Sequence, residues 1–268
     1  MKRLLIAGCG DIGARLARCL DDQHWHVHGL RRNPDQLPAG IEPIRADLLD
    51  PASLAPVRGA WDAIVYQATP AERTEPAYRA AYVEGLSNLL EHSHAERLIF
   101  VSSTAVYGQN SGEWVDEDTA TEPSSFSGRI LLEAENIASQ HGGLSVRFSG
   151  IYGPGRDYLI RSLKSGRARC RPDPPQWTNR IHSEDCAGVL AHLLTVASPA
   201  PVYCASDEKP SPRCEVLDWL AAQLNLSLPI RGGQDSGQGK RVANHRLLAS
   251  GFTFHYPDYT TGYRELLR

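Results

Sequence analysis

The sequence predicts an α/β fold, a doubly wound parallel sheet with a small C-terminal substrate lobe. Two observations predict it. In the first half of the chain, short apolar runs alternate with longer amphipathic stretches, a rhythm typical of parallel β-α-β units. The run from Ala63 to Tyr66 is continuously apolar, which suits a strand that helices cover on both faces.

The individual elements follow from the same periods. Strands are expected at residues 4–7, 26–30, 44–46, 63–68, 98–102 and 144–148, and helices at 11–20, 52–57, 76–92 and 127–140. After Gly150 the sequence pattern indicates loops and shorter helices. There we expect helices at 157–165, 184–194, 214–224, 244–249 and 259–267, and a strand at 202–205.

Length and composition exclude several classes of protein. The chain has 268 residues, 41% hydrophobic and 22% charged, so it can bury a substantial core and is far from disordered composition. Its net charge of −3 gives no basic excess for a phosphate backbone, so nucleic acid is not expected as a partner. No apolar run approaches the ~20 residues of a membrane span, so no membrane partner is expected either.

The N-terminus and the cysteines both indicate a cytoplasmic protein. Lys2 and Arg3 precede only a short apolar run, whereas an export signal needs ~7–15 apolar residues. The cysteines form no Cys-x-x-Cys pair, and their spacings suggest no disulfide framework. We therefore expect six buried, reduced thiols. They are Cys9, Cys19, Cys170, Cys186, Cys204 and Cys214.

A glycine motif follows the first expected strand. Gly8, Gly10 and Gly13 fit Gly-x-Gly-x-x-Gly and open the first expected helix, the context that this motif requires. Gly8 would allow the tight turn, Gly10 would let a pyrophosphate approach the backbone, and Gly13 would let the helix pack closely on the strand. The helix N-terminus would offer amides to the phosphates. The motif predicts a dinucleotide-binding Rossmann fold, the alternative being a glycine-rich turn without a ligand.

The residues after the second strand bear on which dinucleotide binds. An acidic residue ~20 positions past the motif would bind the ribose 2′-hydroxyl of NAD, but this sequence has Arg31 and Arg32 there. Two guanidiniums suit the 2′-phosphate of NADP, so NADP is expected and NAD or a solvated basic loop is the alternative. Asp47 would accept a hydrogen bond from the adenine amino group or cap the next helix. The expected cofactor residues are Gly8, Gly10, Asp11, Ile12, Gly13, Arg31, Arg32, Asp47, Leu48, Ala68 and Thr69.

Three alternating histidines, His24, His26 and His28, lie on or near the second strand. Alternation would place their imidazoles on one face of the strand. Metal sites usually draw ligands from more than one element, and the sequence shows no partner for these histidines. No metal site is therefore predicted, and a polar start to the strand is the simpler interpretation.

Four later segments together resemble one family, the extended short-chain dehydrogenase/reductases of the NAD-dependent epimerase/dehydratase group. They cover nearly the whole chain in the family's order, and the glycine motif resembles that of the atypical subgroup. The segments are residues 100–108 (FVSSTAVYG), 151–156 (IYGPGR), 179–185 (NRIHSED) and 201–207 (PVYCASD). The resemblance implies that 1–150, completed by 177–205, form the NAD(P)-binding Rossmann domain, and that 151–176 and 206–268 form the substrate-binding lobe.

The family's chemistry implies a catalytic set that this chain matches only in part. A Ser or Thr at the end of the fifth strand orients the substrate oxygen, and Ser103 matches that position. A tyrosine acts as acid and base, and a lysine four residues later lowers its pKa. Ser127 and Leu131 occupy the Tyr and Lys positions here, and the adjacent register gives Phe126 and Ile130. Neither pair supplies a phenol or an ammonium group.

Other side chains could take over catalysis or hold the substrate. The candidates for acid-base chemistry are Tyr66, Tyr107, Tyr152 and His182, each of which could instead be structural. Arg156 and Arg180 are expected to contact an anionic group of the substrate, because guanidiniums pair well with phosphate and carboxylate. Thr104 and Tyr152 complete the expected substrate contacts.

Two functions remain open from the sequence. The first is an NADP-dependent reductase, epimerase or dehydratase of a sugar-nucleotide-like or small carbonyl substrate. The second is a sensor or scaffold that binds NADP(H) without turnover, which the Ser127 and Leu131 positions favour. The expected partners are a small-molecule substrate and, as in much of the family, a second copy of the chain paired through residues 76–92 and 127–140.

Overall fold

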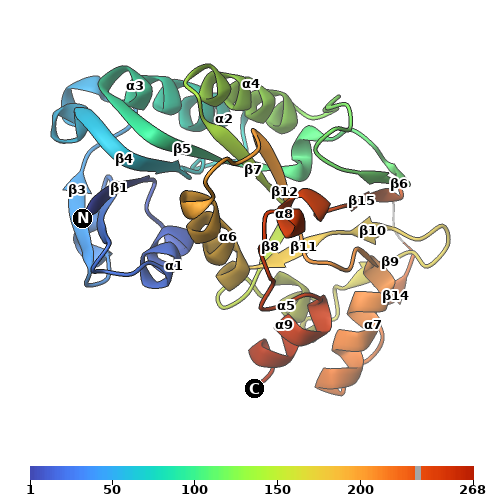
Figure 1. Ribbon diagram of the computed structural model, residues 1–268. Helices are drawn as coiled ribbons and strands as arrows, with labels where there is room; N and C mark the ends of the chain where they lie inside the picture. The colour runs from blue at the N-terminus through green and yellow to red at the C-terminus, as the bar shows by residue number, and fades with distance from the viewer. Residues whose placement is uncertain (233–236) are drawn as a thin grey trace. The chain divides into compact units, whose positions relative to one another are not determined.

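The computed structural model contains a seven-stranded sheet with the order β12-β7-β5-β4-β1-β2-β3 (Figure 1). The structure describes residues 1–232 and 237–268. The pairs β1–β2, β1–β4, β2–β3 and β4–β5 are all parallel. The strands are β1 (Lys2–Ala7), β2 (Trp25–Arg31), β3 (Ile41–Arg45), β4 (Gly59–Tyr66), β5 (Ser93–Ser103), β7 (Leu144–Phe148) and β12 (Val202–Ala205).

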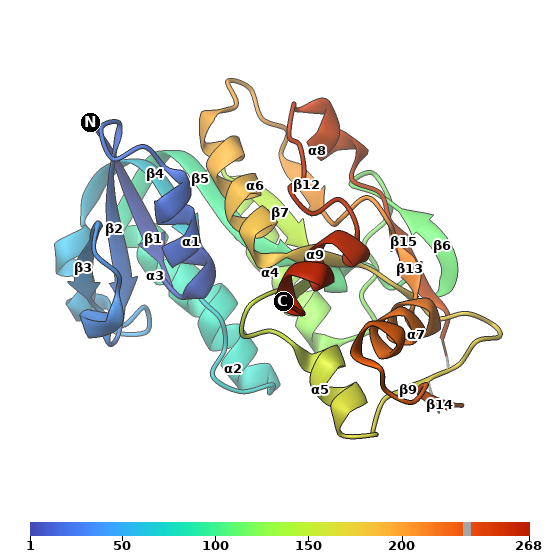
Figure 2. The same cartoon turned by 90° about the horizontal axis from the view of Figure 1, so that it is seen from below.

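Helices cover both faces of this sheet. Figures 1 and 2 show α2, α3 and α4 on one face and α1 and α6 on the other. Their bounds are α1 (Asp11–Cys19), α2 (Glu75–Arg79), α3 (Gly85–His92), α4 (Phe126–Gln140) and α6 (Ser183–Thr195). Strand order and layering confirm the predicted doubly wound α/β fold.

The remaining elements are short strand pairs and helices. The pairs are β6 (Ser111–Val115) with β15 (Gly239–Val242), β8 (Gly150–Tyr152) with β11 (Arg180–His182), β9 (Arg169–Cys170) with β14 (Ile230–Arg231), and β10 (Trp177–Thr178) with β13 (Ser211–Pro212). The helices are α5 (Tyr158–Lys164), α7 (Arg213–Leu224), α8 (His245–Ala249) and α9 (Tyr259–Leu266). The sequence analysis predicted β12 but none of the strands in these four short pairs.

Two helices differ from the sequence prediction. The segment expected as one helix over 76–92 is interrupted by a π-helical turn, η3 (Ala80–Glu84), between α2 and α3. The segment expected as a helix over 52–57 is a 3₁₀-helix, η2 (Pro51–Val57). Pro51 and Pro56 have no amide hydrogen to donate, which favours this short 3₁₀ turn over an α-helix. Two single-turn 3₁₀ segments, η1 (Pro34–Gln36) and η4 (Thr104–Val106), complete the secondary structure.

The chain divides into two units. Unit 1 comprises residues 1–106, 121–147 and 187–203, and unit 2 comprises 107–120, 148–186 and 204–268. Unit 2 has its own hydrophobic core, in which Ile160 of α5, Leu217 and Leu220 of α7 and Tyr263 of α9 are buried. The assignment of cofactor and substrate binding to particular ranges of the chain stays a prediction.

The cysteines depart from the expectation of six buried, reduced thiols. Cys170 of β9 and Cys214 of α7 form a disulfide, with Cα atoms 5.3 Å apart. Cys19 is exposed at the end of α1, whereas Cys9, Cys186 and Cys204 are buried as expected and form no disulfide. Sequence spacing could not reveal the pair, because the packing of α7 near β9 brings together cysteines 44 residues apart.

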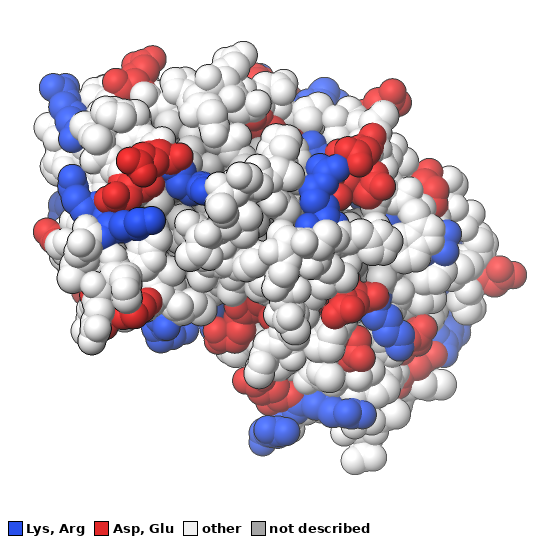
Figure 3. Space-filling model, in the orientation of Figure 1, with Lys and Arg blue, Asp and Glu red and all other residues white. Residues whose placement is uncertain are grey.

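Surface and helix properties agree with the composition. In the described part of the chain, no helix is both long and apolar enough to cross a membrane. On the face shown in Figure 3, lysine and arginine side chains are interspersed with aspartate and glutamate, and neither sign dominates.

A buried ion pair fastens α4 to the sheet. Arg147 of β7 donates through Nη2 to Glu135 of α4 at 2.6 Å, and both side chains are 6% exposed. Ser102 of β5 donates its hydroxyl to the same carboxylate at 2.5 Å. Charges buried in this way are stable only when their hydrogen bonds are satisfied, so this network fixes one helix against two strands.

Removing one partner of this network should destabilise the protein far more than breaking a surface pair on the same helix. Arg147→Met leaves the Glu135 carboxylate buried without its cation, a loss of ~3–5 kcal/mol. Arg79→Met breaks the pair with Glu133, in which both side chains are 44% exposed, and should cost little because water screens that pair. Urea unfolding of both variants measures the difference, and equal losses would contradict this account.

Candidate functional site

The glycine motif forms a tight turn that leaves no room for a side chain at its first position. Gly8 has φ +79°, and a Cβ there would lie 2.5 Å from the Cα of Ala68, which follows β4. The amides of Gly8 and Cys9 both donate to the carbonyl of Leu30 at the end of β2. The turn after β1 is therefore packed between the ends of its two neighbouring strands.

Helix α1 begins in this turn with no side chain capping it. Its N-cap is Gly10, which supplies no side-chain hydrogen bond, and the nearest atom to a Cβ built on Gly10 is 3.9 Å away. A Cβ on Gly13 would instead lie 2.2 Å from Nε2 of Gln67 and 3.0 Å from Sγ of Cys9. Gly10 thus leaves space for a ligand at the helix N-terminus, and Gly13 allows close packing.

A cavity of about 480 Å³ lies beside this turn within unit 1. Eight of the predicted cofactor residues line it, namely Gly8, Gly10, Arg31, Arg32, Asp47, Leu48, Ala68 and Thr69. Asp11, Ile12 and Gly13 do not line it: the Asp11 carboxylate accepts from Arg15 at 2.9 Å, and Ile12 and Gly13 are buried. The cavity lies at the carboxyl ends of β1, β2 and β4, where open α/β sheets bind ligands.

The arginines at the end of β2 are not neutralised by the nearest acidic residue. Asp35 pairs with Arg45 of β3 at 2.7 Å. Arg31 donates to the carbonyl of Cys9 at 3.5 Å, and Arg32 lies exposed at the cavity. Two guanidiniums therefore border the cavity without a carboxylate partner among the described residues.

The structure assigns the helix cap to another residue than Asp47. Asp50 caps η2, since its side chain accepts from the amide of Ala52 at 3.1 Å. Asp47 accepts from the amide of Leu49 at 3.0 Å and lines the cavity beside Leu48. The capping alternative for Asp47 is therefore wrong, whereas its contact with adenine stays a prediction.

A second cavity, of about 180 Å³, lies within unit 2 and carries a buried positive charge. Arg180 is 4% exposed, and its Nη2 donates to Thr178 at 2.5 Å while its Nη1 has no hydrogen-bond partner in the described structure. Arg156 and Tyr152 line the same cavity, as predicted, and Arg213 adds a third guanidinium that the sequence analysis missed.

A buried carboxyl close to Arg180, that of Asp207, offsets its charge only in part. Asp207 is 1% exposed, and burial raises its pKa to about 8 although Arg180 opposes that shift. Its Oδ1 accepts from the amide of Lys209, whereas its Oδ2 has no partner among the residues described. Because a raised pKa favours the neutral form, Asp207 compensates the Arg180 charge less than an ordinary aspartate would.

The sequence matches the family described as the NAD dependent epimerase/dehydratase family over residues 4–202. The chain belongs to that family. The resemblance drawn from the four motifs is thereby confirmed. The protein named YeeZ from Escherichia coli K12 is 32% identical over 280 residues, covering 96% of this chain and 97% of its own.

Solved structures share the fold along the whole chain. A provisionally assigned NAD-dependent epimerase/dehydratase from Methylobacillus flagellatus is 40% identical, with a TM-score of 0.85 and coverage of 99% of this chain and 97% of its own. Two more distant structures share the fold alone. MoeE5 with UDP-glucose and NAD is 23% identical, with a TM-score of 0.82 and coverage of 100% of this chain and 97% of its own. Human SDR39U1 with NADPH is 20% identical, with a TM-score of 0.80 and coverage of 99% of each chain.

Membership of the NAD dependent epimerase/dehydratase family makes this chain an NAD(P)-binding protein. The residues present fit such a cofactor: the open position at Gly10, the uncapped start of α1 and the adjoining cavity leave space for a pyrophosphate and its nucleoside.

The family's catalytic positions lie at the end of β5 and the start of α4. Ser103 ends β5, and its hydroxyl accepts from the amide of Ala105 at 3.2 Å. A Cβ on Gly128 of α4 would lie 2.3 Å from the carbonyl oxygen of Ala105, so the two segments are in close contact. Ser127 and Leu131 of α4 are buried, at 8% and 4% exposure, and neither offers an acid of phenolic strength.

Most of the proposed substitute groups are held in structural roles. Tyr66 is fully buried, and its hydroxyl donates to the carbonyl of Ala81. Tyr107 is buried and donates to the carbonyl of Asp116 at 2.6 Å. His182 is fully buried, and its Nδ1 accepts from the amide of Glu184 at 3.3 Å. Burial raises the pKa of the Tyr152 hydroxyl far above its ordinary value, which makes it a poor acid near neutral pH.

Sequence reasoning missed several residues of unit 1 around the cofactor cavity. Ala77 of α2 and Ala80 and Ala81 of η3 line the cavity, and their small size carries no signal of binding. On the same helix, the half-buried ring of Tyr78 meets the ring of Phe126, next to Ser127, edge to face with centroids 5.4 Å apart. No motif marks Tyr78, because Phe126 lies on another helix, α4.

Substitution of Gly8 should show how strictly the turn is built. Gly8→Ala meets both a left-handed backbone and the backbone of Ala68, so it should lose clearly more stability than the ~1–2 kcal/mol of a left-handed alanine. Gly40→Ala is the matched control, since Gly40 has φ +90° and open space around it. Thermal unfolding compares them, and equal losses would show that the contact with Ala68 is unimportant.

Proposed function

We propose that the protein is an NADP-dependent oxidoreductase that reduces a carbonyl, or oxidises the matching hydroxyl, of a small substrate with an anionic group. The observation that carries the proposal is the cavity in which an uncapped helix start and two unpaired guanidiniums, Arg31 and Arg32, face the same space. When bound, the nicotinamide supplies or accepts the hydride.

NADP is favoured over NAD by the charges at the end of β2. Arg31 and Arg32 line the cavity at the end of the strand that carries the ribose-binding residue in this architecture. Asp35, the acidic residue closest in sequence, is engaged by Arg45. A 2′-phosphate would therefore meet two cations and no competing carboxylate from Asp35.

The anionic group of the substrate is proposed to bind in the cavity of unit 2. The guanidinium of Arg180 is buried, charged and unpartnered at Nη1, and Arg156 and Arg213 line the same cavity. A buried cation with an unused donor is costly unless an anion completes its coordination. A phosphate, as in a sugar nucleotide, or a carboxylate meets this requirement.

Acid-base chemistry needs a group that the family's usual positions do not supply. We propose that Ser103 orients the substrate oxygen and that the phenol of Tyr78 transfers the proton. In support, Tyr78 is half-buried, contacts Phe126 beside the family's tyrosine position, and follows Ala77, which lines the cofactor cavity. Tyr82, one turn further on, has its pKa raised to about 12 by burial.

Cofactor choice can be tested by calorimetry. Changing Arg31 and Arg32 together to alanine should weaken NADPH binding at least ~10-fold and leave NADH binding nearly unchanged, because only NADPH carries the 2′-phosphate. Arg45→Ala, which removes the nearby cation paired with Asp35, is the control. An equal loss of both nucleotides in the double variant would remove the argument for NADP.

Turnover can be tested by NADPH absorbance with a panel of carbonyl substrates bearing phosphate or carboxylate groups. Ser103→Ala and Tyr78→Phe should each lower kcat ~10²–10⁴-fold while NADPH still binds, the usual contribution of acid-base catalysis. Tyr82→Phe should retain activity. If NADPH binds but no substrate consumes it, the protein is instead a binding module that senses NADP(H).

Two expectations from the sequence, a cytoplasmic location and a homodimer paired through residues 76–92 and 127–140, stay predictions.

A further inference from the structure

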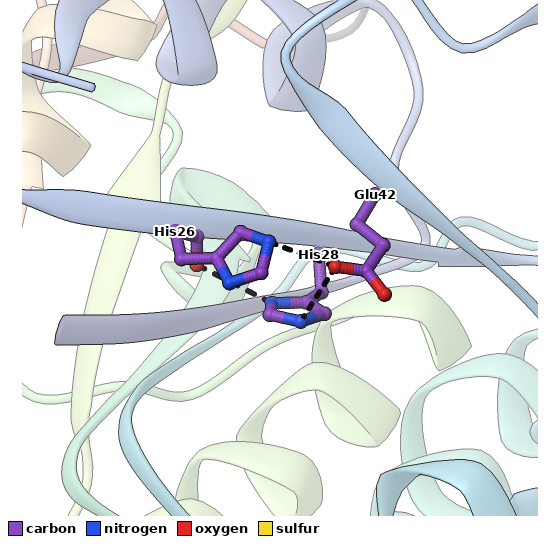
Figure 4. A group of neighbouring side chains, drawn as sticks. All are labelled: His26, His28 and Glu42. Atoms are coloured by element: carbon purple, nitrogen blue, oxygen red, sulfur yellow. Dashed lines mark hydrogen bonds and ion pairs between the residues drawn. The ribbon is translucent and has the colours of Figure 1, made fainter. Parts of the chain in front are cut away.

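Two histidines and a glutamate converge on the outer strands of the sheet, outside the cofactor cavity. His26 and His28 alternate along β2, so their side chains lie on the same face of the strand. Glu42 of β3 is paired in register with His28. Figure 4 shows the imidazole rings and the carboxylate pointing toward one another. The ligand atoms of all three lie within 4.8 Å of one another.

Both imidazoles direct the same nitrogen to the same carboxylate oxygen. Nε2 of His26 lies 2.8 Å from Oε2 of Glu42, and Nε2 of His28 lies 3.4 Å from it. Nδ1 of His28 lies 3.3 Å from the carbonyl oxygen of His26, which can only accept a hydrogen bond. That contact places the proton on Nδ1, so the Nε2 lone pair of a neutral His28 faces the carboxylate.

This arrangement is suited to a shared cation. The lone pair on Nε2 of a neutral His28 and those on Oε2 of Glu42 lie 3.4 Å apart and repel each other. A metal ion between the two atoms would accept both lone pairs and remove this repulsion. With Zn–N distances of 2.0–2.1 Å, ligand atoms of a tetrahedral zinc site lie ~3.3 Å apart. The His28–Glu42 pair already has this spacing, and the shorter His26–Glu42 pair needs to open by only ~0.5 Å, which two half-exposed side chains allow.

We propose that His26, His28 and Glu42 bind a divalent transition-metal ion of the zinc type, with water at the fourth position. Two imidazoles and one carboxylate are a donor set that suits zinc and its neighbours rather than magnesium or calcium. The side chain of His28 is 8% exposed and that of His26 48%, so the site is anchored on one side and open to solvent on the other.

The surroundings hold His28 in place. Its ring meets Trp61 of β4 edge to face, with centroids 4.9 Å apart. The nearby cation Arg3 lies over the Trp61 ring at 4.1 Å and donates to the carbonyl of Ala60 at 3.4 Å. Packing of this kind, together with the bond from Nδ1 to the carbonyl of His26, fixes the ring orientation and tautomer as outer contacts do in metal sites.

The structure also provides the ligand from a second strand that the sequence analysis did not find. His24 lies outside the cluster, in an exposed ion pair with Asp21 at 2.7 Å. The third ligand comes instead from β3, where only the parallel register of β2 with β3 brings Glu42 beside the histidines.

Zinc binding to the purified full chain tests the proposal directly. The protein is stripped with a chelator and titrated with zinc chloride against a chromophoric zinc indicator, in a Cys19→Ser background that removes the exposed thiol. The parent should bind one zinc ion per chain. His26→Ala and Glu42→Gln should each weaken that binding ~100-fold or more, while His24→Ala, the matched control on an exposed histidine, should leave it unchanged.

A second measurement locates the ion. Copper(II) or nickel(II) at the site should quench tryptophan fluorescence, because Trp61 contacts His28. The quenching should be absent in His26→Ala, whose circular dichroism should match the parent. The proposal is overturned if the parent binds no zinc, if binding survives both ligand substitutions, or if His24→Ala loses it equally.

Discussion

The contact between Gly8 and Ala68 is the constraint on which the cofactor site depends. Only a residue without a Cβ can turn the chain there, because a Cβ would lie 2.5 Å from backbone. In the sheet, β1 lies between β2 and β4, and the turn holds the start of α1 at the carboxyl end of β1. This is the point of an open sheet where chain order reverses and a crevice opens. Space for a ligand and an uncapped helix start therefore coincide for steric reasons.

Two buried arginines show how partners decide between structure and function. Arg147 in β7 forms an ion pair with Glu135, and this pair fixes α4 to the sheet. Arg180 in β11 is equally buried, but Thr178 engages only its Nη2, and the nearby Asp207 has its pKa raised to about 8. Burial alone does not distinguish them. The unused donor Nη1 of Arg180 distinguishes the two arginines. A buried cation without a partner lowers stability, so its presence is explained best by a function such as binding an anion.

Local patterns in the sequence were enough to predict the central strands, helix α4 and the glycine turn, because Gly8 and Gly13 are required by contacts only a few elements away. Features that depend on tertiary register were not predictable. Glu42 becomes a neighbour of His28 only through the pairing of β2 with β3, and Cys170 meets Cys214 only through the packing near α7. Ala77, Ala80 and Ala81 of the cofactor cavity were not predicted, because a small apolar residue on a helix has no chemistry that a motif can mark.

The π turn between α2 and α3 joins the fold to the site. In η3 the amide of Gly85 donates to Ala80, which lengthens the helical turn and leaves the carbonyl of Ala81 without its usual helical donor. The hydroxyl of Tyr66 donates to that carbonyl, and Gly85 leaves it room, since a Cβ there would lie 2.7 Å from the hydroxyl oxygen. Tyr66 is thereby committed to structure. The same turn places Ala80 and Ala81 on the cofactor cavity directly after the helix that carries Tyr78. α2 thus carries a phenol directly after Ala77 of the cofactor cavity, whereas α4 carries Leu131 where the family has a lysine, and this placement is the reason Tyr78 is the proposed proton donor.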